Sequence, residues 1–217
     1  MRQSIDTVKL GAVVTAIGTI LSAIATTPIK SIPESIQDDF EFIGNILEAL
    51  GTAIASEEDA TALVQAGEII SIIGNIEVDA SILTDNSELQ NLLDKQGGLL
   101  QVLGEAATLP FGEQLSKNEV IATIGSILDI IGNIIQVLVD DITEQGIIWN
   151  AVGGWIQAIG AVIVVIARGI ASHQFKCKHC SKEFRINWTK VIITEHSGNE
   201  YRLVCPFCKT KDWCAEQ

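Results

Sequence analysis

Glycine residues recur in pairs seven positions apart through the first 160 residues of the chain. The pairs are Gly11 and Gly18, Gly44 and Gly51, Gly67 and Gly74, Gly97 and Gly104, Gly125 and Gly132, and Gly153 and Gly160. They bound the octapeptides GAVVTAIG, GNILEALG, GEIISIIG, GGLLQVLG, GSILDIIG and GGWIQAIG, which share the form Gly, any residue, two apolar, one polar, two apolar, Gly. Six matches in one register indicate an internal repeat, in which one structural unit is used six times.

The octapeptide fits an amphipathic helix. At about 100° per residue, the four apolar residues cover one broad arc, and the two glycines nearly eclipse each other at its edge. The central polar residue falls on the remaining side, where we expect solvent. Each glycine costs about 1 kcal/mol relative to alanine in a helix, so close packing against another helix must compensate. We therefore expect the glycine edges to contact other helices, within one chain or between chains.

Breaks between the repeats indicate where the helices begin and end. Capping-box spacing occurs at Ser56 with Asp59, Ser87 with Gln90, and Ser116 with Glu119, and prolines stand at 28, 33 and 110. The helices are expected near residues 4–26, 35–56, 58–75, 87–107, 117–142 and 145–171. This even number predicts a mainly α fold, a six-helix repeat bundle of three antiparallel hairpins over residues 1–172.

The last 41 residues hold all five cysteines. Cys177 and Cys180 form one CxxC pair, Cys205 and Cys208 form another, and 24 residues separate the pairs. Two such pairs supply the four thiolates of a tetrahedral Zn²⁺ site, and four protein ligands leave no open position for catalytic water. We therefore predict a structural zinc site in a small β ribbon over residues 173–217, in a reducing compartment.

The rest of the ribbon supports this prediction. Strand composition is seen at 184–188, 190–194 and 201–204, with a turn expected at 196–199. The fifth cysteine, Cys214, is interpreted as a free thiol, although it can also be packed or replace a ligand. His179 and His196 are expected at the surface, with a role as metal ligands as the alternative. Trp188 and Trp213 are expected to pack over the metal site, with stacking on nucleic-acid bases as the alternative.

Charge divides the chain in the same way. Residues 31–146 hold 21 acidic residues and two basic ones, Lys95 and Lys117, whereas residues 174–217 hold eight basic and five acidic ones. The formal net charge of −13 disfavours a nucleic-acid partner, because phosphate attraction needs clustered cations. The basic ribbon leaves nucleic-acid binding as a minor hypothesis. The acidic part is interpreted as a solvated face that keeps an apolar protein soluble.

Two segments are long enough to cross a bilayer. Residues 10–29 and 146–167 carry no charge, and both reach the length of a membrane span. The charge distribution would place the N-terminus and the basic ribbon in the cytoplasm. Polar residues such as Thr15 and Gln157 favour the alternative, in which both segments are buried helices of a cytoplasmic bundle. A soluble bundle that opens and inserts is a third possibility.

Two local patterns resemble known families. The segments CKHCSKEF and CPFCKTKDWC resemble the zinc-ribbon tails of uncharacterised bacterial proteins, although Ser181 stands where such tails often have glycine. The segments IGNILEALG and WIQAIG resemble uncharacterised glycine-heptad repetitive proteins of Gram-positive bacteria. The resemblance implies the architecture and no activity.

These observations favour a protein that is not an enzyme. The chain lacks the phosphate-binding loop, GxSxG and HExxH motifs, and no histidine precedes residue 173. The first hypothesis is a helical repeat protein that binds copies of itself or another helical protein, with the ribbon as a docking module. The alternative is a protein anchored or inserted in the inner or plasma membrane, with the ribbon in the cytoplasm.

Overall fold

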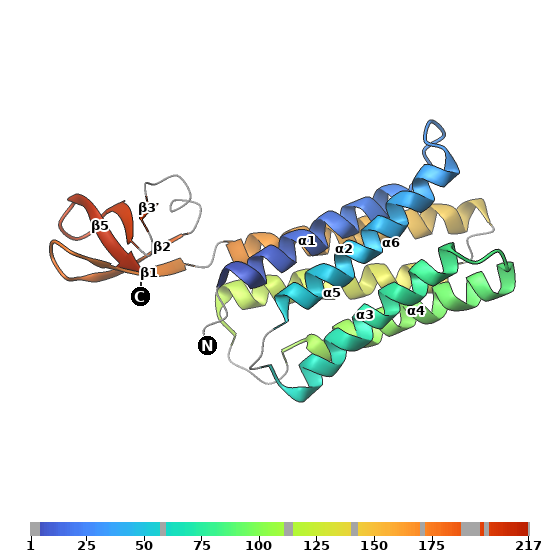
Figure 1. The fold of residues 1–217 in the computed structure, drawn as a ribbon, viewed down its shortest axis with the longest axis horizontal. Coiled ribbons are helices and arrows are strands. Elements are labelled where there is room, and N and C mark those ends of the chain that lie inside the picture. Colours follow the sequence, from blue (N-terminus) through green and yellow to red (C-terminus); the bar gives the residue numbers. More distant parts are fainter. Residues whose placement is uncertain are drawn as a thin grey trace. The chain divides into compact units, whose positions relative to one another are not determined.

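The fold consists of a helical unit followed by a small β unit. The structure, a computed structural model, describes residues 5–56, 60–110, 115–139, 143–169, 172–187, 196–197 and 200–216. It divides into two compact units, residues 1–165 and 166–217. Within the described residues six helices precede five short strands, which confirms the expected class of fold (Figure 1).

The helices follow the repeat. They are α1 (Ile5–Ala25), α2 (Glu34–Ala55), α3 (Ala62–Ile82), α4 (Ser87–Thr108), α5 (Lys117–Leu138) and α6 (Glu144–Gly169). The expected end of α3 at residue 75 was wrong, because burial of Val78, Asp79 and Ser81 carries the helix further. The expected ranges also include residues 4, 58–59, 140–142 and 170–171, which lie outside the described part of the chain.

The helix caps agree with the expected signals in one case of three. Ser116 and Glu119 form the predicted capping box at the start of α5. Ser56 instead ends α2, and the hydroxyl of Thr61 caps α3 by accepting from the backbone N–H of Val64. At α4 the cap is Asn86, one residue before the expected serine.

The glycine pairs lie where two helices of one hairpin cross. Gly11 of α1 meets Gly51 of α2, Gly18 meets Gly44, and the same antiparallel pairing joins α3 to α4 and α5 to α6. A Cβ added to any of these twelve glycines would lie 2.5–2.9 Å from the carbonyl oxygen of its partner glycine. Only glycine allows backbones to approach this closely, so the repeat produces three antiparallel hairpins.

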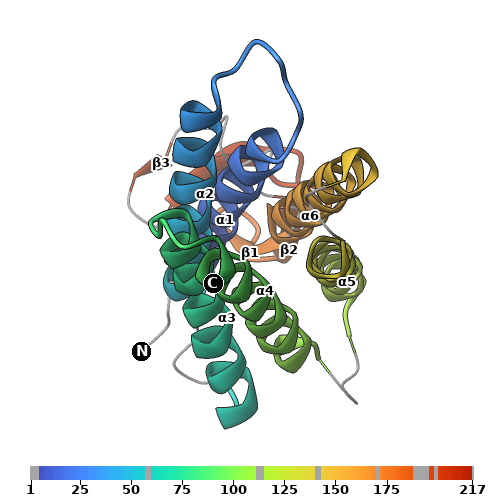
Figure 2. The same cartoon turned by 90° about the vertical axis from the view of Figure 1, so that its right-hand side faces the viewer.

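The hairpins enclose a common interior. Side-chain hydrogen bonds join Asn45 of α2 to Asp79 of α3, and Asn133 of α5 to Glu105 of α4. The indole N–H of Trp155 on α6 donates to the Thr27 hydroxyl, just after α1, over 3.0 Å. The six helices therefore form a ring, which Figure 2 shows in a view along the helices.

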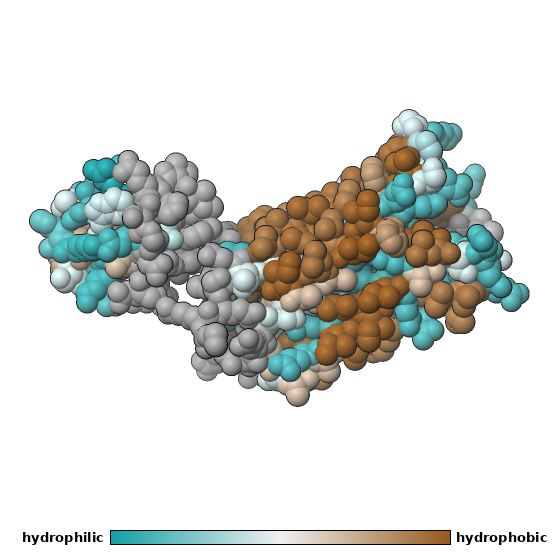
Figure 3. Space-filling view, viewed as in Figure 1, coloured by the Kyte–Doolittle hydropathy of each residue, from teal (hydrophilic) through white to brown (hydrophobic). Residues whose placement is uncertain are grey.

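The ring places polar side chains inside and apolar ones outside, which is the reverse of the expected arrangement. The third and seventh residues of all six octapeptides are exposed and apolar: Val13, Ile17, Ile46, Leu50, Ile69, Ile73, Leu99, Leu103, Ile127, Ile131, Trp155 and Ile159. The central polar residues were expected in solvent, yet Ser71, Gln101 and Gln157 are only 5–7% exposed. Because the glycine edges and the polar side chains take the inner side, the apolar arc is left outside (Figure 3).

The β unit is a single antiparallel sheet. Its strands are β1 (Ser172–Cys177), β2 (Glu183–Asn187), β3 (His196–Ser197), β4 (Glu200–Val204) and β5 (Lys211–Glu216), in the order β2-β1-β5-β4-β3. Sequence reasoning missed β1 and β5 and assigned β3 to a turn. Residues 188–195, which include Trp188 and an expected strand, lie outside the described residues.

Candidate metal centre and interior cavity

Each CxxC pair of the β unit forms a tight turn at the end of a strand. After β1, the Ser181 N–H donates to the Cys177 carbonyl over 2.8 Å; after β4, the Lys209 N–H donates to the Cys205 carbonyl over 2.9 Å. Ser181 has φ 56° and Lys209 has φ 60°, which is the left-handed region that favours glycine. The glycine missing from the sequence is thus replaced by a serine in the conformation that glycine prefers.

The two turns bring four thiols together. The Sγ atoms of Cys177, Cys180, Cys205 and Cys208 all lie within 4.8 Å of one another. The Cys177–Cys208 and Cys180–Cys205 distances are 3.8 and 3.6 Å. A tetrahedral ion with metal–sulfur bonds of about 2.3 Å needs sulfurs about 3.8 Å apart. The four cysteines can therefore hold a metal ion, and their geometry and donor set fit Zn²⁺.

An apolar cluster supports the cysteines. Phe175 and Cys214 have no exposed surface, and Leu203 is 3% exposed. The Phe175 ring packs edge-on against Tyr201, with centroids 5.4 Å apart. These residues fix β1, β4 and β5; one CxxC pair begins at the end of β1, and the other directly follows β4. Cys177 and Cys205 of the four-cysteine cluster belong to the same apolar cluster, so a metal ion bound there would stabilise the fold of the sheet.

The thiols differ in their electrostatic surroundings. A backbone hydrogen bond from Thr210, with its side chain, lowers the pKa of Cys208 to about 6, which favours the metal-binding thiolate. Burial, followed by the proximity of Cys177, raises the pKa of Cys214 to about 12. Cys214 lies opposite Cys177 in the β1–β5 register, outside the four-cysteine cluster. Its side chain is buried in the apolar cluster, which is the packed alternative that the sequence left open beside a free thiol.

The other singled-out residues of the β unit do not join the metal site. His179 is exposed and Trp213 is half-buried. The side chain of His196 and all of Trp188 lie outside what the structure describes. The four-cysteine cluster is thus built from the cysteines alone among the described residues.

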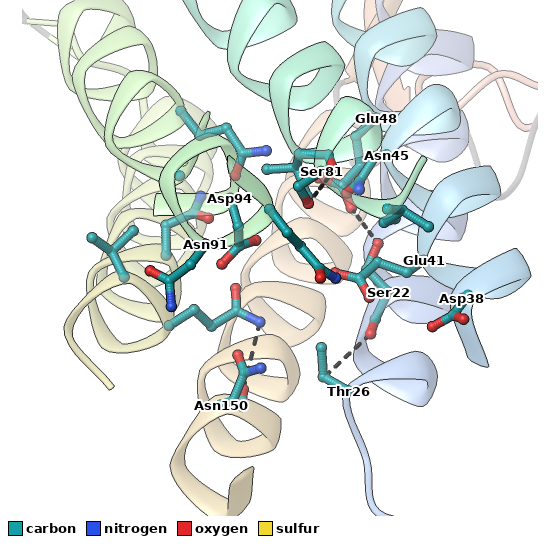
Figure 4. Close-up of a pocket in the computed structure, with 18 of the residues that line it drawn as sticks. Ser22, Thr26, Asp38, Glu41, Asn45, Glu48, Ser81, Asn91, Asp94 and Asn150 are labelled. Carbon is teal, nitrogen blue, oxygen red and sulfur yellow. Dashed lines mark hydrogen bonds between the residues drawn. The ribbon is translucent and has the colours of Figure 1, made fainter. Parts of the chain in front are cut away.

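The helical unit contains an interior cavity of about 460 Å³. All six helices line it, and every lining residue is polar or charged except Val78, Ile82, Gly98 and Val137. Figure 4 shows Ser22, Asn45 and Glu48 on one side, from α1 and α2, with Asn91 and Asp94 on the opposite side. Sequence reasoning gave no such cavity, because it placed the polar residues in solvent.

Hydrogen bonds connect the polar groups around the cavity. The Ser22 hydroxyl donates to Glu48 over 3.1 Å, and the Asn45 amide donates to Asp79 over 3.1 Å. The Gln101 amide donates to Asn75 over 3.0 Å. Asn45 and Asn75, like Asn133, directly follow a glycine of the repeat and are 3–5% exposed. The recurring Gly-Asn dipeptide is the sequence signal that could have identified this interior.

The family comparison covers the helical unit. A model for a family of unknown function, DUF6944, matches residues 6–165. The chain belongs to this family. The DUF6944 match ends where the first compact unit ends, at residue 165, and does not include the metal centre. No curated protein and no solved structure matches the chain.

Proposed function

We propose that the chain is a non-catalytic membrane protein: the helical bundle is inserted in a bilayer and the β ribbon binds Zn²⁺ in the cytoplasm. The observation that carries the proposal is the outward apolar surface. At the two outward positions of every octapeptide stands Ile, Leu, Val or Trp, and all twelve side chains are exposed. In water these outward apolar side chains would remain exposed and would not contribute hydrophobic stabilisation to the fold. In a bilayer they would contact lipid, and the polar groups would be enclosed within the bundle.

The lengths of the helices support insertion. Residues 7–25, 117–138 and 144–168 are long and apolar enough to cross a membrane. The corresponding helices α1, α5 and α6 adjoin one another, since α6 contacts both α1 and α5. The other three helices, α2, α3 and α4, carry the same repeat and the same exposed positions. We therefore infer that the bundle inserts as a whole.

Orientation follows from charge. The basic ribbon after α6 favours the cytoplasmic side under the positive-inside rule, and reduced thiols persist there. A structural role for the metal is favoured because four thiolates complete a tetrahedral shell. The glycine edges in the described helices pair within the chain, so binding to another copy or another helical protein is no longer needed to explain them.

Fractionation of cells expressing the full chain tests insertion. We expect the chain in the membrane pellet, resistant to alkaline carbonate and released by detergent. Release by carbonate contradicts insertion, and a soluble oligomer without detergent supports self-association instead. Metal analysis of the purified chain is expected to give one zinc ion per chain, and a metal-free chain with a folded ribbon contradicts the zinc proposal.

A matched pair of substitutions separates lipid from water at the outer surface. Ile131 on α5 is 42% exposed. In a soluble bundle Ile131→Lys is neutral or improves solubility. In a bilayer it costs about 2.5–3.5 kcal/mol near the membrane centre, so we expect the variant to fall in abundance. The control is Asp85→Lys, at an exposed position between α3 and α4, and equal tolerance of both lysines contradicts insertion.

A further inference from the structure

We propose that the interior cavity is a binding site for a hard inorganic cation, which enters at the ends of the helices where the hairpins turn. This proposal rests on the proposed function for the side from which the cation arrives. The cavity lies inside one unit of the fold, and residues of all six helices line it. It is therefore a feature of the assembled bundle and not of one helix end.

The position of the cavity defines its mouth. Its lining includes Ser22 and Thr26 at the end of α1, Glu34 at the start of α2, and Ser87 at the start of α4. These are the ends at which α1 is followed by α2 and α3 by α4. Glu34 and Ser87 are exposed, whereas Gln101, deeper in the bundle, is 7% exposed. The cavity thus leads from solvent at this end toward the middle of the bundle.

The charge of the lining selects cations. The carboxylates Glu34, Asp38 and Glu41 project from α2, Asp94 adds one from α4, and the described residues of the lining include no lysine or arginine. Walls of low dielectric focus the field of such groups into a cleft and concentrate ions of opposite charge. Anions are correspondingly repelled. A cation is the solute that this lining attracts.

The donor atoms select a hard cation. The lining offers the hydroxyl oxygen of Ser22 at the mouth and, beyond it, the amide oxygens of Asn45, Gln101 and Gln157. Oxygen ligands suit alkali and alkaline-earth ions, and arrays of such dipoles replace part of the hydration shell in channels. One water occupies about 30 Å³ in the liquid, so about 460 Å³ accommodates an ion with retained water.

Two thiol reagents of opposite charge test the cavity in the detergent-purified, zinc-loaded chain. Gln101→Cys places a thiol in the cavity, and Leu103→Cys places one on the outer surface of the same helix, where Leu103 is 62% exposed. Each variant is treated with cationic or anionic methanethiosulfonate, and the adduct is located by peptide mass spectrometry. The ribbon thiols are thereby distinguished from the introduced one.

We expect the cationic reagent to modify Gln101→Cys at least tenfold faster than the anionic one, with no such preference at Leu103→Cys. Adding Asp38→Asn, at an exposed residue of the mouth, should reduce the preference at least threefold. Calcium, magnesium or potassium chloride should slow the cationic reagent more than N-methylglucamine chloride does at equal ionic strength.

Three results overturn the proposal: equal rates for the two reagents, no reaction at Gln101→Cys when Leu103→Cys reacts, or no protection by any of the three metal ions. A Gln101→Cys chain that fails to fold is replaced by Asn91→Cys, an exposed lining position, with the same criteria. Because these rates are measured in detergent, they stand apart from fractionation. A soluble chain with cation preference refutes the membrane proposal alone.

Discussion

The adjacent residues Gly97 and Gly98 of α4 allow one substitution to be compared at two neighbouring positions. At Gly97 a Cβ would lie 2.6 Å from the carbonyl oxygen of Gly74 and 2.9 Å from the backbone nitrogen of Val78. At Gly98 the nearest atom is Cγ2 of the Val137 side chain, at 2.5 Å. Gly97→Ala therefore strikes the backbone of α3, whereas Gly98→Ala strikes the end of a side chain that can rotate.

The two variants share their intrinsic helix preference and differ in packing. Each gains about 1 kcal/mol from replacing glycine in a helix interior. To restore ordinary contact at Gly97, the backbones of α3 and α4 must separate by roughly 0.8 Å, and such overpacking costs about 3 kcal/mol. The net loss for Gly97→Ala is then about 2 kcal/mol. Rotation of Val137 costs about 1 kcal/mol, so Gly98→Ala is close to neutral.

Unfolding in mixed micelles measures this difference. The fraction of sodium dodecyl sulfate is raised in a mild detergent, and far-ultraviolet circular dichroism and tryptophan fluorescence follow the transition. We expect Gly97→Ala to unfold at a clearly lower fraction than the parent chain, and Gly98→Ala to match the parent. If the two variants differ by less than about 0.5 kcal/mol, within ordinary additivity error, the glycine crossings do not hold the hairpins together.

Three further predictions concern the β unit and a helix cap. Cys208→Ser should abolish stoichiometric zinc in metal analysis while Cys214→Ser retains it, since Cys214 lies outside the cysteine cluster; equal loss in both would count against the assigned ligands. Phe175→Ala, which empties a site with no exposed surface, should cost about 3–5 kcal/mol and raise the chelator sensitivity of the ribbon; unchanged zinc release would contradict the coupling. Ser116→Ala should remove the capping box of α5 and lower stability by about 1 kcal/mol, whereas Ser87→Ala should have less effect because Asn86 supplies the cap.

The repeat predicted the helices because its periodicity is strong and local. The pairing of Gly11 with Gly51 and of Gly18 with Gly44 follows from the same pattern, once adjacent repeats form an antiparallel hairpin. The four cysteines of the candidate metal site were predicted from spacing alone, since two CxxC pairs have few other uses in one short segment. The strands β1 and β5 were missed because alternation is weak in SHQFKC and KDWCAE, where pairing across the sheet decides the structure.

The direction in which each helix faces could not be predicted from its own sequence. An amphipathic pattern separates an apolar side from a polar one, but it does not say which side meets the other helices. The partners of Asn45 and Gln101 decide this, and they come from segments 34 and 26 residues away. A helical wheel drawn with water as the assumed surroundings therefore placed Glu48 and Asp129 outside. Which side faces outward depends on the medium around the bundle, and the sequence of a single helix does not specify that medium.

Each glycine crossing joins two helices that follow one another in sequence. One hairpin is therefore the smallest segment of this protein that contains both sides of a glycine crossing. Synthesis delivers three such pieces in turn, and each can close before the next emerges. Loss of the last hairpin would open the ring between α1 and α4 yet leave the earlier crossings unchanged. Adding or removing a whole pair of helices would keep every remaining glycine crossing complete, whereas a single inserted helix would leave one glycine edge without its counterpart.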